Sequence, residues 1–477
     1  MNYLNFGQSA LVLISILCVL TLVVLKNWRF GMYTFFVWLP FEDFVRKFAG
    51  NDMVIYFVKD FIIAITYFSF VMWSRHSGQK DRLRNPIAVP LALWFIWSVI
   101  QVFNPSLPGL ILGPIGLRMS FIYVPLLYLG YHFFATERTL RKFARIVLLV
   151  ALVVGAVGLG QLLRGPEFLN PSGMEVRGLL LTSTRGTEES GYFSYMSSVF
   201  TNAARFGRFS LVTLAIVGGI FFYARSSQYR RLSRYSLLAL IVIMANLLVN
   251  GSRALFLVVV AFILAFVWMT SMSRRGPIRA FVLGRRMVLI AIIGLVSLLL
   301  VNAVNPRVVS AITGFYGQTL RPDSQEFEVT DRIKKYAFTN RGSVWGAVTK
   351  SGVLAHGTGS ASQGQQYLGI EKPHDWVPVE GGYAAIAWEH GIIGVVLVLW
   401  WAVFLLRAQY RVVRRLRDTR LHGLGVGIFL WSMAFLFPLT FMGMQVFQDF
   451  IPNAYFWFWS GVIFKLPDLI ESNANPS

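Results

Sequence analysis

Long apolar runs, separated by short polar or basic segments, make up most of this chain. The runs are continuous, without the alternation of a membrane barrel, so they predict membrane-spanning α-helices. The second run is short and turn-forming residues beside Asn453 interrupt the last, so twelve spans is the alternative to thirteen. The predicted spans are 9–25, 30–41, 54–73, 86–103, 118–134, 146–163, 209–224, 235–250, 254–272, 287–304, 382–405, 423–441 and 454–467.

Two predicted connections are far longer than the others, 164–208 and 305–381. Both are rich in polar and charged residues, yet they also hold aromatic and apolar residues. Long loops in compact folds are commonly functional, and the aromatic content predicts an ordered external cap. The expected organisation is one all-α polytopic membrane domain over 1–477, with 305–381 capping an active site.

Positive charge is concentrated in six short loops, which hold 25 of the 44 Lys and Arg residues. Short basic loops beside apolar runs stay in the cytoplasm, which places the N-terminus and both long loops outside and the C-terminus inside. The net charge of +22 therefore indicates orientation and contact with membrane lipids, not nucleic-acid binding. The loops are 26–29, 75–84, 138–145, 225–234, 274–286 and 407–420.

Composition supports this class. With 56% hydrophobic residues, 14% charged residues and a mean hydropathy of +0.59, a soluble enzyme is excluded. The single cysteine, Cys18, excludes a disulfide framework and a thiol-ligated metal site. The N-terminal segment lacks a basic region and a small-residue cleavage site, so it is expected to be a retained helix.

The segment "NGSR", residues 250–253, separates two apolar spans with almost no linker. Arg253 is expected at the outer interface, where an arginine is unfavourable unless it is paired or solvated. A guanidinium offers a planar fork of donors that suits phosphate, so Arg253 is a candidate catalytic residue. The alternative is an arginine that only anchors its helix end.

A second candidate region runs from Tyr336 to Gly364. Arg341 precedes an amphipathic segment, after which Gly357 and Gly359 alternate with Ser and Thr. Such a loop can turn several backbone N–H groups toward an anion, but it is neither a Walker loop nor a dinucleotide-binding motif. The alternative is a flexible surface loop.

Further arginines lie at outward positions near the ends of predicted spans. Together they could line one electropositive basin that binds a lipid diphosphate. For each arginine taken alone, the alternative is that it sets the membrane topology or forms a salt bridge. The substrate-binding candidates among them are Arg118, Arg177 and Arg205, with Arg185 and Arg208 on the same side.

Acid–base candidates gather in and beside the second long loop. They form no HExxH motif, paired-histidine motif or acidic pair, so no metal is expected, and no GxSxG motif is present. Arginines with a few bases suit transfer to a hydroxyl, because arginine stabilises an anionic leaving group while a base takes the proton. The candidates are His356, His374, His390, Glu371, Asp375, Glu380 and Glu389.

Four segments in order, "NGSRALFLVV", "NRGSVWGAV", "HGTGSASQG" and "EGGYAAIAWEHGIIGVVL", resemble the O-antigen ligase and polymerase superfamily of bacterial envelope glycosyltransferases. The resemblance covers roughly 205–405. It implies a C-type glycosyltransferase-like fold in the bacterial inner membrane, with a periplasmic active site. It also implies an undecaprenyl-diphosphate-linked glycan donor, a glycan acceptor and no metal or other cofactor. Arg253 and Arg341 match the two functional arginines, which would bind the diphosphate.

The chain departs from the ligases of this superfamily at one position. Ligases that load lipid A-core typically carry a His-Asn pair about nine residues before the Glu of an E-x-G segment, here Glu389. The matching residues are Glu380 and Gly381. We therefore interpret the chain as an exopolysaccharide or O-antigen polymerase, with an O-antigen ligase as the alternative and a polysaccharide copolymerase as the candidate protein partner.

Glu380 is the candidate catalytic base in this interpretation, at the membrane surface where a lipid-linked donor presents its sugar, and His374 is its substitute. Gly381 and Gly382 would let the backbone approach the glycan, and Tyr383 could stack on a sugar face. The alternative is that Glu380 only favours the N-terminus of the following helix.

A transporter of lipid-linked oligosaccharide and a non-catalytic assembly scaffold are the competing functions. Transport predicts ionisable groups deep within spans and interrupted helices near the midplane. The predicted spans are nearly free of charge, with Asp60 the main exception, near an outer end. Chemistry at one face is therefore favoured over a path across the membrane.

Overall fold

The computed structural model describes residues 6–50, 52–77, 86–165, 167–171, 175–176, 179–180, 184–187, 191–194, 196–250, 252–272, 277–304, 306, 309, 344–362, 370, 379, 381–436 and 448–474. The side chains of Arg253 and of 172–195 lie outside this description.

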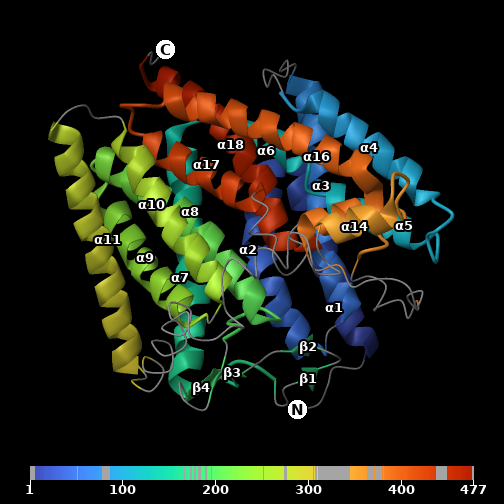
Figure 1. Ribbon diagram of the computed structural model, residues 1–477, viewed down its shortest axis with the longest axis horizontal. Coiled ribbons are helices and arrows are strands. Elements are labelled where there is room, and N and C mark those ends of the chain that lie inside the picture. The colour runs from blue at the N-terminus through green and yellow to red at the C-terminus, as the bar shows by residue number, and fades with distance from the viewer. Residues whose placement is uncertain are drawn as a thin grey trace.

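Helices make up nearly all of the described structure and pack side by side into a bundle (Figure 1). Two short antiparallel hairpins, β1–β2 and β3–β4, lie in the connection between the seventh and eighth helices. The first half of the chain contains α1 (Phe6–Lys26), α2 (Trp28–Phe48), α3 (Met53–Ser77), α4 (Ala88–Val102), α5 (Leu112–Phe121), α6 (Leu126–Phe133), α7 (Glu137–Arg164), β1 (Glu175–Val176), β2 (Leu179–Leu180), β3 (Thr184–Thr187) and β4 (Gly191–Ser194). The second half contains α8 (Ala203–Ser226), α9 (Arg230–Val249), α10 (Arg253–Ser271), α11 (Pro277–Val304), α14 (Val344–Ser351), α16 (Gly382–Arg415), α17 (His422–Leu436) and α18 (Phe450–Ala474).

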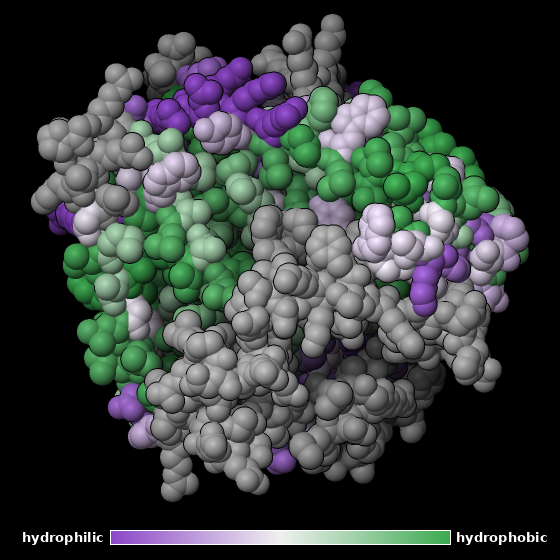
Figure 2. All heavy atoms as spheres, viewed as in Figure 1, coloured by the Kyte–Doolittle hydropathy of each residue, from purple (hydrophilic) through white to green (hydrophobic). Residues whose placement is uncertain are grey.

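Seven helical segments of the described residues are long and apolar enough to cross a membrane: Met53–Ser77, Leu112–Phe133, Glu137–Arg164, Ala203–Ser226, Arg230–Val249, Gly284–Ala303 and Gly382–Arg415. Four further apolar helices are shorter. Figure 2 shows the wide hydrophobic surface that these helices present, with a hydrophilic patch at its upper edge. The architecture fits a multi-pass membrane protein, so the predicted helical class is confirmed. The number of spans and the glycosyltransferase-like fold remain predictions.

The second predicted span, 30–41, is longer than expected. α2 continues to Phe48, although its last two turns carry four charged side chains. These side chains are all buried, Glu42, Asp43, Arg46 and Lys47 being at most 4% exposed. The helix therefore continues where hydropathy predicts an end, because its charges are held inside the bundle.

The last predicted span also differs from the structure. α18 begins at Phe450 and runs without interruption through Asn453, where a turn was expected. The Asn453 side chain is fully buried, and its amide donates to the carbonyl oxygen of Met119 at 3.2 Å. A hydrogen bond to a neighbouring helix, not a turn, explains the polar residue.

α18 lies close against α6 along a line of glycines. A Cβ at Gly130 would overlap the Phe458 carbonyl group, and a Cβ at Gly461 would overlap that of Leu127. Glycines at such contacts let two helix backbones approach closely. This contact holds the middle of α18 against α6, and the start of α18 takes part in the site described below.

α16 is not the single straight span expected over 382–405. It is broken at Gly391, whose backbone adopts φ 65° and ψ −166°, a conformation almost restricted to glycine. A Cβ there would also overlap the carbonyl oxygen of Val353. The nine residues before the break, Gly382–His390, therefore form a separate half-helix that packs against the segment after α14.

Candidate functional site

Asp43, on α2, is the centre of a group of buried charged side chains. It is fully buried and accepts hydrogen bonds from Arg46 Nη2 at 2.8 Å and Arg205 Nη1 at 2.5 Å. The backbone N–H and the hydroxyl of Thr201 donate to the same carboxylate at 3.2 and 3.1 Å. Four donors from two distant parts of the chain thus compensate for the burial of one carboxylate.

Arg205 connects this group to the start of α18. The side chain of Asn202 caps α8 by accepting from the Arg205 N–H at 2.8 Å, which places Arg205 in the first turn. Its guanidinium binds Asp449 through Nε at 3.2 Å as well as Asp43. Arg208, one turn further along α8, donates to the other oxygen of Asp449 at 2.9 Å.

A second set of ion pairs joins α3 to its neighbours α2 and α5. Lys59 and Glu42 form a pair at 3.1 Å in which both side chains are fully buried. Arg118 on α5 pairs with Asp60, its Nε lying 2.8 Å from the carboxylate. This pair is less enclosed, since 23% of the Arg118 side chain is exposed.

Two aromatic rings lie among these cations. The Tyr56 and Phe450 rings are 6.2 Å apart, and the Lys59 ammonium lies 3.3 Å from the Tyr56 centroid and 4.5 Å from that of Phe450. Three guanidinium groups also lie over these rings, those of Arg46, Arg118 and Arg205. The negative ring faces stabilise buried cations that carboxylates only partly neutralise.

Lys47 has a different environment from the other buried cations. Its ammonium donates to the Asn170 side chain at 2.5 Å and to the Ser198 carbonyl at 2.7 Å, and no carboxylate among the described residues lies within 4 Å of it. The Ser198 backbone has a positive φ of 51° and is also held by Gln161. Lys47 therefore fixes the end of the first long connection against α2.

Together these side chains form what we call the charge network. It holds more basic than acidic groups. Its members lie in the last two turns of α2, in the first turns of α3 and of α8, on α5, and at the residue before α18. It thus lies at one end of these helices and not at their middle. By the predicted orientation this is the outer end. The basic members are Arg46, Lys47, Lys59, Arg118, Arg205 and Arg208, and the acidic members are Glu42, Asp43, Asp60 and Asp449.

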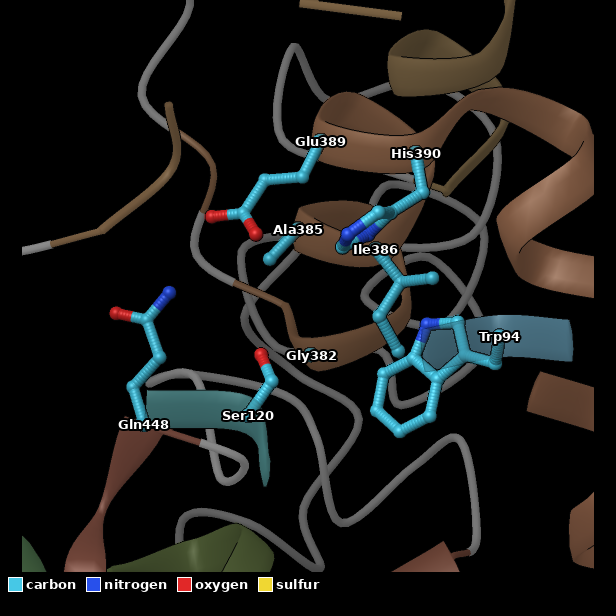
Figure 3. Close-up of a pocket in the computed structure, with 8 residues that line it drawn as sticks. All are labelled: Trp94, Ser120, Gly382, Ala385, Ile386, Glu389, His390 and Gln448. Atoms are coloured by element: carbon cyan, nitrogen blue, oxygen red, sulfur yellow. The ribbon is translucent and has the colours of Figure 1, made fainter. Parts of the chain in front are cut away.

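A small pocket lies beside the charge network. Its volume of about 20 Å³ is enough for one water-sized group. Glu389, only 5% exposed, directs its carboxylate toward Gln448 and Ser120 (Figure 3). No basic side chain of the described residues lies within 4 Å of this carboxylate. The lining residues are Trp94, Ser120, Gly382, Ala385, Ile386, Glu389, His390 and Gln448.

One wall of the pocket is tied to the segment that follows α14. The Ala361 N–H donates to Glu389 Oε1 at 3.1 Å, and Thr358 Oγ1 lies 3.2 Å from His390 Nε2. The His356 ring stacks on Trp388 with centroids 3.9 Å apart. Three consecutive residues of the half-helix therefore hold this segment in place.

Gly357 and Gly359 have positive φ angles of 94° and 87°, and both are buried inside the protein. A Cβ at Gly357 would lie 3.0 Å from the Gln101 carbonyl oxygen, and one at Gly359 would overlap that of Leu112. The neighbouring N–H groups bond within the protein, as that of Thr358 does with Gln101. The surface-loop expectation is therefore wrong for the described residues 357–362, where the glycines allow the chain to pack tightly against α4 and α5, and anion binding by this loop stays a prediction.

The structure brings together two predicted substrate-binding arginines, Arg118 and Arg205, in the charge network. Both form ion pairs, as the salt-bridge alternative expected. Tyr383 is 5% exposed, and its hydroxyl donates to the Leu436 carbonyl at 2.9 Å. Its ring is therefore packed inside the bundle and is not available to stack on a sugar, contrary to expectation.

The other predicted site residues lie outside the described part of the structure. Arg177, Arg341, His374 and Glu380 are outside the described residues, and Arg253 begins α10 but its side chain is not described. No group of three metal-ligating side chains occurs among the described residues.

Of the acidic members of the charge network, the sequence singled out only Asp60, and Glu42, Asp43 and Asp449 were missed. A signal was present in "FEDFVRKF", residues 41–48, where two acidic residues precede two basic ones at helical spacing. Glu389 was among the acid–base candidates but was given no role in the site, although a carboxylate within a predicted span is unusual.

Comparisons with known proteins do not assign the chain to a family. No protein-family model matches the sequence, and no curated protein matches it significantly. On its own structure, the chain is a helical protein with the architecture of a multi-pass membrane protein.

Proposed function

We propose that the protein is a membrane glycosyltransferase that takes glycan from a polyprenyl-diphosphate carrier, undecaprenyl diphosphate by the resemblance, and passes it to a sugar hydroxyl. Polymerisation of exopolysaccharide or O-antigen repeat units is the form we favour, and ligation to lipid A-core is the alternative. The observation that carries the proposal is the basic excess of the charge network at one end of the bundle. Such an excess at the predicted outer interface suits the diphosphate of a lipid carrier.

In this proposal the more accessible arginines face the diphosphate. Arg118 and Arg208 keep 23% and 17% of their side chains exposed, and Arg253 and Arg341 complete the diphosphate site by the resemblance. Positive charge fixed beside the diphosphate stabilises the charge that develops as the carrier leaves.

The proposed reaction is a single displacement. The acceptor hydroxyl oxygen attacks C1 of the donor sugar, and the bond between C1 and the diphosphate oxygen breaks with its electron pair remaining on undecaprenyl diphosphate. The configuration at C1 is inverted. Glu380 takes the hydroxyl proton, with His374 as its substitute.

A transporter of lipid-linked oligosaccharide remains the second candidate. The fully buried Glu42–Lys59 pair favours it, because the spans hold more ionisable groups than the sequence indicated. These groups lie at the ends of their helices, however, so we favour chemistry at one face.

An in vitro transfer assay tests the proposal. Purified protein in detergent receives a lipid-diphosphate-linked oligosaccharide in the presence of EDTA, and wild type is compared with Arg341→Ala and Glu380→Gln. Arg414→Ala is the control, since Arg414 is an exposed arginine at the other end of a long helix. We expect wild type and the control to form longer glycan and release undecaprenyl diphosphate, and both site variants to lose this activity.

The other results are equally informative. If Glu380→Gln keeps full activity, Glu380 is a helix-start residue and His374 is the base to replace. If wild type releases no undecaprenyl diphosphate but moves the lipid-linked oligosaccharide across vesicle membranes, the protein is a transporter and the glycosyltransferase proposal is wrong.

A further inference from the structure

The pocket around Glu389 has the properties of a binding site for a single polar group. Its carboxylate is at least nine-tenths buried and is directed into the pocket (Figure 3). Burying a carboxylate without a cationic partner is unfavourable unless hydrogen-bond donors satisfy it. Backbone N–H groups of Gly359 and Ala361 supply two such donors, and a carboxylate can accept about four. Acceptor capacity is therefore left for a ligand.

The lining residues restrict the chemistry of that ligand. Glu389 can only accept hydrogen bonds when ionised, whereas Gln448 and Ser120 can both donate and accept. The ligand group must therefore be a donor, and a volume of about 20 Å³ admits one hydroxyl-sized group. A cation is disfavoured, because the neighbouring charge network already has an excess of positive charge and the described residues offer no set of three metal ligands.

The pocket and the charge network share two parts of the chain. Ser120 lines the pocket two residues after Arg118, which belongs to the network. Gln448 lines the pocket directly before Asp449, which binds Arg205 and Arg208. A hydroxyl in the pocket would therefore lie near the two stretches of chain that carry Arg118 and Asp449 of the network, which suits an acceptor that must reach a donor bound at that end of the bundle.

We propose that this pocket binds a hydroxyl group of the acceptor glycan, with Glu389 accepting its hydrogen bond and Ser120 and Gln448 completing the subsite. The proposal rests on the proposed function, and it gives Glu389 a role in binding the acceptor, not in the proton transfer. Trp94, held between Phe121 and Trp401, forms a rigid wall of the same pocket.

The test compares Glu389→Gln with wild type in the transfer assay. A glutamine carbonyl oxygen has two lone pairs and can still accept from the backbone N–H groups of Gly359 and Ala361, so we expect the fold around the pocket to be preserved. A hydrogen bond to a neutral acceptor is about half as strong as one to a carboxylate, so we expect the acceptor KM to rise about tenfold. The donor KM, kcat and thermal midpoint should be unchanged. Ser120→Ala should raise the acceptor KM less, and Glu471→Gln, which alters an exposed carboxylate on α18, should change nothing.

Binding measured without donor separates this proposal from the proposed function. The probe is a lipid-free oligosaccharide, cut by mild acid from the envelope glycan of the producing cell, and saturation-transfer NMR detects it on protein in nanodiscs. Binding by wild type that Glu389→Gln weakens supports the pocket even if no transfer occurs.

Three results would overturn the proposal. They are an unchanged acceptor KM in an active Glu389→Gln variant, a fall in kcat or in thermal midpoint without a specific change in acceptor KM, and an absence of oligosaccharide binding by wild type. In the first case glycan transfer would still stand as the function.

Discussion

The charge network and the end of α16 are both strongly basic, but they are built in opposite ways. Arg407, Arg411, Arg414 and Arg415 are exposed, and none has a carboxylate within 4 Å among the described residues. In the network, by contrast, Asp43 and Glu42 are buried together with the cations that they bind. Exposed arginines need only water and lipid headgroups and can set the orientation of a helix. Buried ones need partners from distant parts of the chain, so replacements in the two regions should differ greatly in effect.

Replacing Asp43 should have the largest effect. Asp43→Asn removes the charge that compensates Arg46 and Arg205, and breaking a buried ion pair from one side typically costs about 3–5 kcal/mol. Thermal unfolding in detergent should show a large fall in midpoint, whereas Asp418→Asn, at an exposed carboxylate, should show almost none. Equal midpoints for the two variants would show that the network adds nothing to stability.

The Glu42–Lys59 pair allows a double-mutant cycle. Lys59→Met alone leaves a buried carboxylate without its partner and should lower stability by about 3–5 kcal/mol. Adding Glu42→Gln removes that uncompensated charge, so the double variant should be more stable than Lys59→Met alone. Additive losses in the same unfolding measurement would mean that the two side chains are not coupled.

Gly391→Ala should have the next largest effect. Alanine must adopt a strained backbone conformation, which costs about 1–3 kcal/mol, and its Cβ would also overlap the Val353 carbonyl. The matched control is Gly294→Ala on α11, where a Cβ meets no atom within 4 Å. The control should be neutral or slightly more stable, because alanine favours a helix by about 1 kcal/mol. A variant at Gly391 as stable as this control would rule out a fixed break in α16.

Replacing an arginine at the end of α16 should have the smallest effect. Arg414→Gln alters an exposed side chain, so the change in unfolding free energy should stay within about 0.5 kcal/mol. Arg205→Gln, which removes a buried cation from two carboxylates, is the direct counterpart in the network and should lower the midpoint clearly. Similar shifts for both arginines would remove the distinction between the two regions.

The helical class could be predicted from the sequence because hydropathy reports directly on continuous apolar runs. The end of α2 and the start of α18 could not be predicted from the sequence, since a hydropathy pattern places the ends of spans at charged and amide residues. Glu42 and Asn453 instead lie inside the bundle, where partners on other helices bind their polar groups. The break at Gly391 was hidden for a similar reason, because an apolar run reads the same whether its helix is straight or broken.

The site was predicted in part. Arg118 and Arg205 were selected from their positions at span edges, and the structure joins both to the charge network. Their carboxylates, Asp60 and Asp449, follow no local pattern, since Asp449 lies 244 residues from Arg205 in the chain. Partner choice at such separations depends on tertiary packing, which a single sequence does not reveal.

The partners in the charge network lie far apart in the chain, and this has a consequence for how the protein is synthesised. A ribosome delivers α2 long before α8, and α8 long before α18, so Asp43 enters the membrane region before Arg205 exists and Arg208 enters before Asp449. Until synthesis nears its end, these charges have only water, lipid headgroups or insertion factors as partners. The arrival of Asp449, directly before α18, therefore adds a carboxylate that two arginines of a helix made much earlier share, and a chain arrested before residue 449 lacks that carboxylate for both Arg205 and Arg208.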